Sequence, residues 1–370
     1  MRAGKLNLLF IGTYNSEFVK QLCERLDKNR FNIDVFDLEG LKLIRNGEVI
    51  IEHKKSSFYI KKLNSIYDVW MGYKILKQLR LKYDYLQIFY MSYEYMLFFR
   101  KIKQLSENII VHVYGDDFYG NSKNNLIKPM YNVAQKIAFT NPVVRDDFER
   151  HYKFSDPDKY VILNFGLEAL DAIKAENSKD SNRTNNPFAS EKKTVISVGT
   201  STQTVEQHEL IIGELLQLKI PKDKIKFIFQ LNYGPGLNEA ATELLSKLSD
   251  KYETQIVTEY MDIHALAKLR LATDILISLR RSDQLSAAIT ENLYAKSIVI
   301  TGAWLPYKTF KDLGLVFFEI DSIQDINSKL LYVFENFEKV KSEIKTNSDI
   351  VYNNFNWNKI IEDWYAFYLK

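Results

Sequence analysis

Short apolar runs of strand length recur along this chain and alternate with segments long enough to form helices. They are residues 6–12, 31–38, 85–92, 108–115, 136–140 and 160–166 in the first half, and 194–200, 225–231, 254–260, 273–279, 297–302 and 315–320 in the second. Strands that alternate with helices favour β-α-β units, in which right-handed crossovers join parallel strands. The pattern therefore predicts an α/β protein with two parallel sheets.

A polar stretch separates the two halves. The composition shifts between residues 167 and 193, where the chain reads ENSKDSNRTNNPFASEKK from residue 176 onward, a composition typical of a domain boundary. We expect a first domain over 1–166, a linker over 167–193, a second domain over 194–322 and helices over 323–370. Two domains also agree with the length of 370 residues, because single cores rarely grow beyond about 250–300 residues.

The last segment predicts an amphipathic helix. Trp357, Ile360, Ile361, Trp364 and Phe367 recur at helical spacing in WNKIIEDWYAFYLK. An aromatic helix of this kind needs a surface to pack on. We expect it to cross back to the first domain.

Composition and charge exclude several classes of protein. With 46% hydrophobic and 26% charged residues the chain is typical of soluble globular proteins, and a formal charge of +3 argues against nucleic acid as a partner. The apolar run before Gly12 is too short for a signal peptide, and no window reaches the roughly 18 apolar residues of a membrane span. The single cysteine, Cys23, fits a reducing compartment. We expect a cytoplasmic protein.

Common cofactor and metal motifs are missing from the sequence. No GxGxxG follows a strand-like run, and no P-loop, HExxH or CxxC occurs. Asp156 and Asp158 spell DxD, but they lie in the polar turn SDPDKY and contain a Pro between them, so we do not interpret them as a metal site. We expect no bound metal and no resident cofactor.

Polar residues follow the first strand of the second half, and open parallel sheets place ligand sites at the carboxyl ends of their strands. Gly199 permits close backbone approach, and Thr200, Ser201 and Thr202 offer hydroxyl groups at the predicted start of a helix, where a phosphate would bind well. Alternatively, these residues only cap the helix. His208 is predicted about two turns into it.

Two further strand ends carry polar residues. Tyr233 precedes a Gly-Pro-Gly turn at 234–236, and Glu259 and Tyr260 precede a helix that we expect Asp262 to cap. These side chains either surround a base or ribose or face solvent.

Two adjacent arginines follow the strand predicted at 273–279. Arg280 and Arg281 precede Asp283, Gln284 and Ser286. A guanidinium group can grip a diphosphate in bidentate fashion and can stabilise it as it departs. The alternative is a salt-bridged pair on the rim of the sheet.

The first half carries two carboxylates at a strand end. Asp116 and Asp117 follow the run 108–115 directly. A carboxylate in a cleft can deprotonate or orient a sugar hydroxyl, although adjacent aspartates also cap helices. Gly12 lies at the end of the first strand, and we expect it to contact the same hydroxyl-bearing substrate as these aspartates.

Together these positions resemble a known family. One motif of that family, H-x-x-G-x-D-x-Y, is matched by His112, Gly115, Asp117 and Tyr119. A second motif, V-G-x-S followed by a His, is matched by Val198, Gly199, Ser201 and His208. Tyr233 matches a Tyr before a Pro-containing turn, and Arg281 matches an Arg after a late strand. The order resembles GT-B glycosyltransferases, and more narrowly the 4-alpha-L-fucosyltransferase-like family that transfers TDP-linked 4-acetamido-4,6-dideoxy-D-galactose in enterobacterial common antigen synthesis. The chain departs from that family at 283–286, where the family is Gly-rich. Glu291 instead resembles the glutamate that holds the donor ribose in other GT-B enzymes.

The resemblance implies the GT-B fold, with two facing Rossmann-like domains, an interdomain cleft and a C-terminal helix crossing back. It also implies metal-independent transfer from a nucleotide-diphosphate sugar, the co-substrate, to a lipid-linked or saccharide acceptor in bacterial surface polysaccharide synthesis. Together with the strand-end residues described above, the expected donor residues are Gly199, Thr200, Ser201, His208, Tyr233, Glu259, Tyr260, Arg280, Gln284, Ser286 and Glu291. Asp117 and Arg281 are the implied catalytic residues, and Gly12, Asp116 and Tyr119 the acceptor residues.

Segment 59–103 mixes aromatic and basic residues. The mixture includes Lys61, Lys62, Tyr73, Lys74, Lys77, Arg80, Lys82, Phe98, Phe99, Arg100, Lys101 and Lys103. It predicts a surface that rests on the inner face of the cell membrane, or else an aromatic core with solvated lysines. Two further functions stay open for the whole chain, a non-catalytic partner of a transferase and a sugar-nucleotide epimerase.

Overall fold

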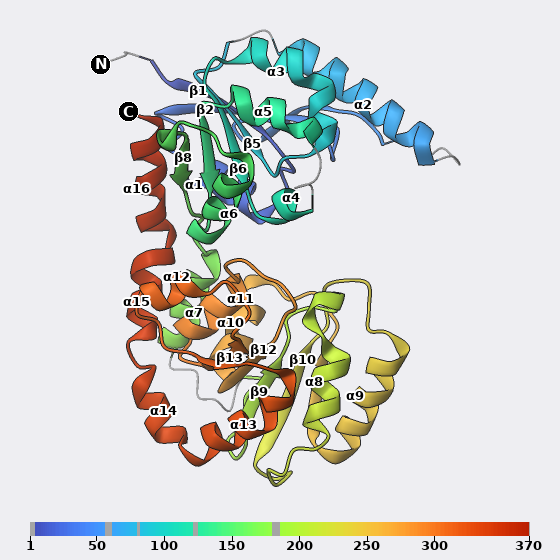
Figure 1. Ribbon diagram of the computed structural model, residues 1–370, viewed down its shortest axis with the longest axis vertical. Coiled ribbons are helices and arrows are strands. Elements are labelled where there is room, and N and C mark those ends of the chain that lie inside the picture. Colours follow the sequence, from blue (N-terminus) through green and yellow to red (C-terminus); the bar gives the residue numbers. More distant parts are fainter. Residues whose placement is uncertain (1–3, 56–60, 80–81, 121–124, 180–185, 370) are drawn as a thin grey trace. The chain divides into compact units, whose positions relative to one another are not determined.

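The computed structural model describes residues 4–55, 61–79, 82–120, 125–179 and 186–369, and the chain divides into two compact units (Figure 1). Unit 1 comprises Met1–Phe165 together with Ile360–Lys370, and unit 2 comprises Gly166–Lys359. The end of the chain therefore belongs to the same unit as its beginning.

Unit 1 is built on an eight-stranded sheet in the order β4-β3-β2-β1-β5-β6-β7-β8. The strands are β1 (Leu6–Ile11), β2 (Phe31–Asp37), β3 (Lys42–Arg45), β4 (Glu48–Glu52), β5 (Tyr85–Phe89), β6 (Ile109–Val113), β7 (Lys136–Phe139) and β8 (Tyr160–Ile162). Those from β2 to β8 in this order are parallel, and β3 and β4 add an antiparallel edge.

The antiparallel edge was not predicted, although its turn has a recognisable sequence. Asn46 and Gly47 join β3 to β4, with φ values of 49° and 94°. Asn-Gly is the pair that two-residue hairpin turns favour, because both central residues of such turns need positive φ. The turn signal could have identified this hairpin.

Helices cover both faces of the unit 1 sheet. They are α1 (Glu17–Arg25), α2 (Lys61–Gln78), α3 (Phe99–Leu105), α4 (Asp116–Tyr119), α5 (Lys128–Val133), α6 (Pro142–Tyr152) and α16 (Trp357–Tyr368), with short 3₁₀ turns η1 (Tyr93–Phe98), η2 (Asn125–Ile127) and η3 (Pro157–Lys159). Buried residues of α2, α3, α5 and α6 pack with one set of alternating strand residues, among them Leu9, Ile88 and Val111. Helices α1 and α16 cover the opposite face (Figure 1).

Helix α16 is held in unit 1 by its aromatic side chains. Trp364 is fully buried, and its indole N–H donates a 2.9 Å hydrogen bond to the Asn164 carbonyl. Tyr365 stacks on Phe31 at 5.9 Å between ring centroids. These contacts complete the core of unit 1.

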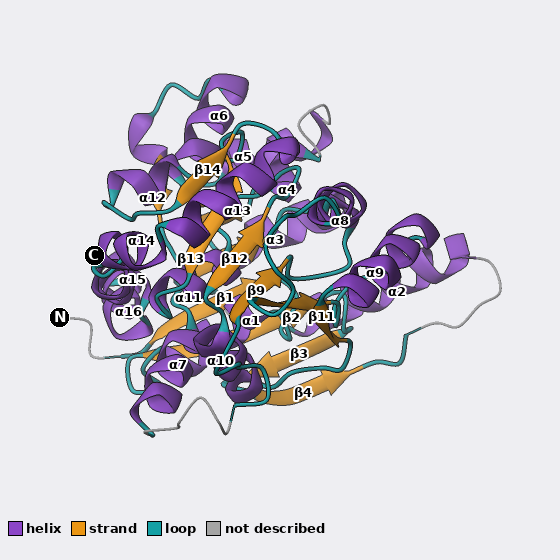
Figure 2. Ribbon diagram, turned by 90° about the horizontal axis from the view of Figure 1, so that it is seen from below, coloured by secondary structure: helices purple, strands orange, loops and turns teal. Residues whose placement is uncertain are grey.

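Unit 2 is built on a six-stranded parallel sheet in the order β11-β10-β9-β12-β13-β14 (Figure 2). Its strands are β9 (Thr194–Val198), β10 (Ile225–Gln230), β11 (Glu253–Val257), β12 (Ile275–Ser278), β13 (Ile298–Gly302) and β14 (Phe318–Ile320). The chain adds strands on one side of β9 and then returns to add β12 on the other. The strand order thus reverses between β9 and β12.

The helices of unit 2 also form two layers. They are α7 (Glu168–Ser178), α8 (His208–Leu215), α9 (Glu239–Lys251), α10 (Ile263–Ala272), α11 (Ala287–Tyr294), α12 (Lys308–Asp312), α13 (Ile326–Glu335), α14 (Phe337–Glu343) and α15 (Asn347–Phe355), with 3₁₀ turns η5 (Thr204–Glu206) and η6 (Ile323–Asp325). One layer contains α8, α9, α13 and α14, and the other contains α7, α10, α11, α12 and α15.

Each apolar run predicted as a strand overlaps a strand of the structure. The stretch 167–193, expected as a linker, begins with helix α7, whose Leu170 and Ile173 are buried in unit 2. Across the part of the chain that the structure describes, no helix is long and apolar enough to pass through a lipid bilayer.

Candidate functional site

The loop after β9 lies beside the reversal of strand order in unit 2. Gly199 has φ +66°, and a Cβ atom at this position would come within 2.5 Å of the His208 ring, so only glycine fits. No helix begins directly after the loop: the short turn η5 and the left-handed Gln207 intervene before α8. The prediction that Thr200 and Ser201 begin a helix is therefore wrong, and His208 is the first residue of α8 rather than a residue two turns into it.

Glu206 binds two hydroxyl groups of the loop after β9 through its buried carboxylate. Its side chain is fully buried, and Oε1 accepts hydrogen bonds from the hydroxyls of Thr200 at 2.8 Å and Ser201 at 3.1 Å. Oε2 has no hydrogen-bond partner among the described residues. The hydroxyl hydrogens of Thr200 and Ser201 thus point to this carboxylate. Sequence reasoning missed Glu206, because no local pattern distinguishes it from a solvated glutamate.

His208 supports the same loop. Its Nε2 lies 2.6 Å from the Ser201 carbonyl oxygen, and the ring is 4% exposed. Because a carbonyl oxygen only accepts hydrogen bonds, Nε2 carries the hydrogen. This contact makes His208 a support for the backbone of the loop.

Arg280 reaches the loop from the neighbouring strand. Its Nη2 donates a 3.3 Å hydrogen bond to Gln203 Oε1, and Nη1 lies 3.9 Å from Glu206 Oε1. Arg281, by contrast, is exposed, and its backbone N–H donates to the Val205 carbonyl at 2.7 Å. Arg280 thus forms an ion pair, as the salt-bridge alternative predicts, but its partner Glu206 is fully buried and does not lie on the rim.

The loop after β10 is tied to the loop after β9. Thr202 donates its backbone N–H to the Tyr233 carbonyl at 2.7 Å, and its hydroxyl accepts the Gly236 N–H at 2.9 Å. The turn at 234–236 forms as predicted, with positive φ at Gly234 and Gly236. The Tyr233 side chain is 66% exposed beside this turn.

The residues that follow Arg281 serve the start of α11 and the loop after β13. Ser286 caps α11 by accepting the Ile289 N–H, and Asp283 Oδ2 accepts the Tyr307 hydroxyl at 2.7 Å. The Gln284 side-chain oxygen is buried without a hydrogen-bond partner among the described residues. These contacts fix the loop that carries Arg280.

Glu291 takes part in a buried ion pair. Its Oε2 accepts a 2.9 Å hydrogen bond from Arg270 Nε, while Arg270 Nη1 donates to Gln230 at 3.1 Å. Both ionic side chains are less than one tenth exposed. The pair links α10 to α11 beneath the carboxyl edge of the sheet.

Glu259 and Tyr260 follow β11, the edge strand. Both are exposed, Tyr260 to 88%, and Asp262 caps α10 as predicted by accepting the Ala265 N–H at 2.7 Å. Two strand spacings, about 10 Å, separate β11 from β9. One nucleoside can span this distance between the end of β11 and the loop after β9.

In unit 1, Asp117 is buried where a general base should be open to substrate. Oδ2 accepts the Met91 N–H at 2.9 Å, and Oδ1 accepts the N–H groups of Tyr114 and Gly115 at 2.9 and 3.0 Å. The side chain is 0% exposed, and burial raises its pKa to about 6. This geometry argues against a direct catalytic role, because the carboxylate joins the loops after β5 and β6 instead.

The other residues proposed for the acceptor lie at the carboxyl edge of the same sheet. Gly12 follows β1, and a Cβ atom there would come within 3.2 Å of Phe89. The Tyr119 hydroxyl, at the end of α4, donates a 2.6 Å hydrogen bond to Asp147. The side chain of Asp116 lies outside the described residues.

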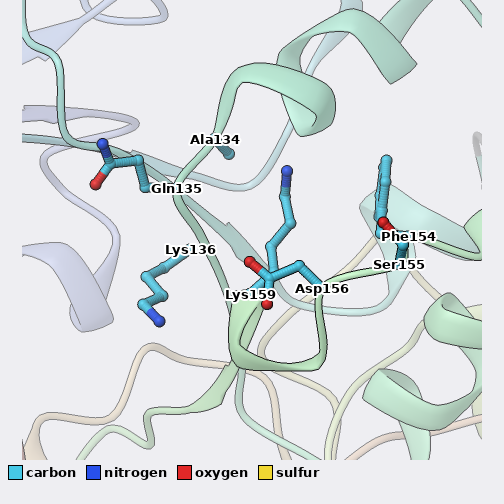
Figure 3. Close-up of a pocket in the computed structure, with 7 residues that line it drawn as sticks. All are labelled: Ala134, Gln135, Lys136, Phe154, Ser155, Asp156 and Lys159. Atoms are coloured by element: carbon cyan, nitrogen blue, oxygen red, sulfur yellow. The ribbon is translucent and has the colours of Figure 1, made fainter.

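A pocket of about 400 Å³ opens at the opposite, amino edge of the unit 1 sheet (Figure 3). It is lined by Ala134, Gln135, Lys136, Phe154, Ser155, Asp156 and Lys159. Asp156 accepts the Asp158 N–H and caps η3, which confirms the DxD spelling as a turn. Parallel sheets place their ligand sites at the carboxyl edge, so this pocket is separate from the predicted site.

Helix α2 carries one face in the core and one outside it. Met71, Ile75 and Leu76 are buried, while Ile66 and Trp70 on the opposite face are 66% and 52% exposed. Segment 59–103 therefore contributes side chains both to the core and to an exposed face. Phe98, predicted as part of the membrane surface, belongs to the core at 2% exposed. Residues 59–60 and Arg80, and the side chains of Lys61 and Lys62, lie outside the described residues.

Within the described ranges, no three His, Cys, Asp or Glu side chains are grouped so that they could hold a metal ion. Metal independence stays a prediction.

Comparison with known proteins identifies the fold. No protein-family model and no curated protein matches the sequence. Among solved structures, a glycosyltransferase from Rickettsia africae matches at 17% identity and a TM-score of 0.69, covering 98% of both chains. Sucrose-phosphate synthase from Thermosynechococcus elongatus matches at 13% identity and a TM-score of 0.70, covering 99% of this chain and 98% of that one.

A third similar structure is Anabaena HepE in complex with UDP-glucose, at 12% identity and a TM-score of 0.66, covering 98% of this chain and all of the other. These likenesses extend over nearly the whole chain. The protein therefore has the GT-B fold that the sequence predicted.

Proposed function

We propose that the protein is a glycosyltransferase that uses a nucleotide-diphosphate sugar as donor. The observation that carries the proposal is the loop 199–203 with Arg280 above it, at the point where the strand order of unit 2 reverses. Open α/β sheets bind their ligands at this point. The similar HepE structure holds UDP-glucose, which supports the same class of donor here.

In this mechanism the loop 199–203 and Arg280 hold the donor diphosphate in unit 2. Arg280 neutralises the charge that develops as the nucleoside diphosphate departs, and exposed Arg281 assists from the same loop. Tyr233, Glu259 and Tyr260 surround the nucleoside. Transfer proceeds without a metal, because the guanidinium groups and backbone N–H groups supply the positive charge.

The acceptor binds at the carboxyl edge of unit 1, at Gly12 and Tyr119. Asp117 acts as a positioning residue, because its three backbone contacts hold the loops on which the acceptor rests. We infer a bacterial role in surface polysaccharide synthesis, with the transferase resembling the 4-acetamido-4,6-dideoxy-D-galactose transferases, and therefore include dTDP among the nucleotides to test.

Isothermal calorimetry with UDP, GDP and dTDP tests the donor site. We expect one of them to bind the wild type, and Arg280→Ala to lose about tenfold or more in affinity, because charged hydrogen bonds contribute about 1.5–3 kcal/mol. Arg281→Ala should lose less. Lys247→Ala, an exposed change on α9, is the control.

If none of the three nucleotides bound, the donor site would be wrong and the non-catalytic partner would be favoured. Conversion of a free sugar nucleotide without any acceptor would indicate an epimerase instead.

The acceptor proposal includes a membrane surface. On α2, Ile66, Trp70, Tyr73, Lys74 and Lys77 lie on one exposed stripe with helical spacing, and Lys74 Nζ lies 3.5 Å from the Trp70 ring centroid. Along the helix, Ile66 and Trp70 precede Lys74 and Lys77. Such a stripe fits the boundary between lipid headgroups and acyl chains.

The neighbouring segment repeats the arrangement. Tyr93 and Leu97 of η1 are 55% and 65% exposed and are followed by exposed Arg100 and Lys103 of α3. Helix α2 and η1 are in contact. We propose that both segments rest on the cytoplasmic face of the cell membrane, where a lipid-linked acceptor is found.

Vesicle sedimentation tests this surface. We expect the wild type to bind vesicles that contain phosphatidylglycerol at low salt, and Lys74→Glu with Lys77→Glu to weaken binding, because each lysine contributes about 1 kcal/mol near an anionic surface. Lys219→Glu with Lys222→Glu makes the same charge change on exposed lysines of unit 2. Equal binding by both double variants would eliminate the α2 surface.

A further inference from the structure

Trp304 is a large apolar side chain left partly in water beside the candidate donor site. It follows β13, which pairs with β12, the strand that leads to Arg280. The residue is 40% exposed, whereas Trp357, also in unit 2, is 1% exposed. An indole ring at the carboxyl edge of a sheet can be covered by a ligand.

The ring of Trp304 is held in a fixed position. Its Nε1–H donates a 2.8 Å hydrogen bond to the backbone carbonyl of Arg280. The ring also lies against Gly302, where a Cβ atom would come within 2.3 Å of it. The indole is thereby fixed on two sides by the residues that flank the site.

The loop that carries Trp304 is equally constrained. Ala303 donates its N–H to the Ile320 carbonyl at 2.9 Å, and the buried Tyr307 donates its hydroxyl to Asp283 at 2.7 Å. A binding group that is fixed before the ligand arrives loses little conformational entropy on binding. Trp304 is thus a preorganised aromatic surface.

The position of Trp304 relative to Arg280 defines which part of a ligand it meets. A nucleotide-diphosphate sugar carries its nucleoside and its sugar at opposite ends of the diphosphate. Tyr233 and Tyr260 lie on the β10–β11 side of the loop 199–203, and Trp304 lies on the β13 side. With the nucleoside on the first side, the sugar lies on the second.

We infer that Trp304 is the platform on which the pyranose ring of the donor stacks. This inference rests on the proposed donor site. The weakly positive C–H groups on one face of a pyranose pack against the electron-rich face of an indole, while Arg280 holds the adjoining phosphate. Trp304 then determines how well a sugar binds, and the nucleotide part of the donor binds independently of it.

Matched pairs of ligands separate these contributions. Calorimetry would compare UDP with UDP-glucose, UDP-galactose and UDP-N-acetylglucosamine, dTDP with dTDP-glucose, and GDP with GDP-mannose, on the wild type and on Trp304→Leu. We expect Trp304→Leu to change nucleoside diphosphate affinity less than about twofold and to weaken the sugar conjugates about three- to tenfold, the range given by an aromatic contact. Trp304→Phe should recover part of the loss.

Trp70→Leu is the matched control, because Trp70 is an exposed tryptophan of unit 1. The chain has four tryptophans, and Trp357 and Trp364 are buried. In a Trp70→Phe background, Trp304 is therefore the one exposed tryptophan. Quenching of its fluorescence by a sugar conjugate but not by the nucleoside diphosphate would report the stacking directly.

Equal losses for a nucleoside diphosphate and its sugar conjugate would overturn the inference and indicate base stacking or a damaged fold. Unchanged affinity for every conjugate would overturn it as well. Failure of the wild type to bind any nucleotide would instead refute the donor site itself, and this inference with it.

Discussion

His112 and Asp117 are buried ionisable side chains of unit 1 that respond to acid in opposite ways. Burial lowers the pKa of His112 from 6.5 to about 3, so the folded protein keeps the imidazole neutral where the unfolded chain protonates it. Burial raises the pKa of Asp117 from 3.8 to about 6, so the folded protein protonates this carboxyl group first.

These shifts have opposite effects on the free energy of unfolding. Above pH 6.5, His112 is neutral in both states and does not change the free energy of unfolding. As the pH falls from 6.5 towards 3, only the unfolded chain protonates His112, so the free energy of unfolding falls by about 1.4 kcal/mol per pH unit. Protonation of Asp117 in the folded state adds a similar increment per unit as the pH falls from about 6 to 3.8. The two contributions offset each other between about pH 6 and 4.

Asp117→Asn should expose the contribution of His112. We expect this variant to lose about 1.4 kcal/mol per pH unit more than the wild type between about pH 6 and 4. Urea unfolding of each protein at several pH values measures the slope, so a constant loss at neutral pH does not matter. Asp146→Asn, at an exposed position, is the control. Parallel pH profiles for Asp117→Asn and the wild type would contradict the compensation.

The sequence predicts where the site residues lie along the chain, but it does not predict which groups they contact. The sequence places Ser201, Asp117 and Arg280 after strands, and parallel sheets then bring such residues to the carboxyl edge. The partners of these residues come from elsewhere in the chain. The backbone N–H groups around Asp117 and the buried Glu206 below Ser201 are contacts of tertiary structure, which no local pattern reveals.

At the scale of elements, α16 provides a large part of the unit 1 core. Trp364→Ala should destabilise unit 1 by about 3–5 kcal/mol, because it removes a fully buried indole and its hydrogen bond to Asn164. Glu362→Ala, at an exposed position of the same helix, is the control. Chemical unfolding followed by circular dichroism measures both, and a loss below about 1 kcal/mol for Trp364→Ala would contradict this role.

Strands were easier to predict than the segments that join them. Runs such as LLFI (8–11) and FIF (227–229) are fully apolar because helices cover both faces of a parallel sheet, and this signal is strong. The segment after β9 has no such signal. There, the left-handed Gln207 delays the start of α8 by several residues, a backbone conformation that its sequence does not indicate.

At the scale of the whole molecule, the two cores should respond separately to a nucleotide. Each unit has its own buried cluster, around β6 in unit 1 and around β10 in unit 2. A nucleotide at 100 times its dissociation constant stabilises what it binds by about 2.7 kcal/mol. Hydrogen exchange should therefore slow in β10 and stay unchanged in β6. Equal slowing in both strands would show that the units unfold together.

The polar stretch near residue 180 stands out from its flanks and is the sequence signal for two domains, although it lies within unit 2, which begins at Gly166. Helix α7 was not separated from it, since the Leu170 and Ile173 pattern is too short to distinguish from a linker. The return of Ile360–Lys370 to unit 1 was expected from its aromatic spacing.

That return has a consequence for how the protein is made. A ribosome delivers the strands of unit 1 long before α16, so the sheet face that Trp364 and Tyr368 cover stays bare until Ile360–Lys370 have been made. Unit 2, whose residues are contiguous, is released before that. Chains that stop before α16 has been made would carry this bare apolar face, the kind of surface that chaperones and proteases recognise. Unit 1 therefore finishes folding only after the whole of unit 2 has been synthesised.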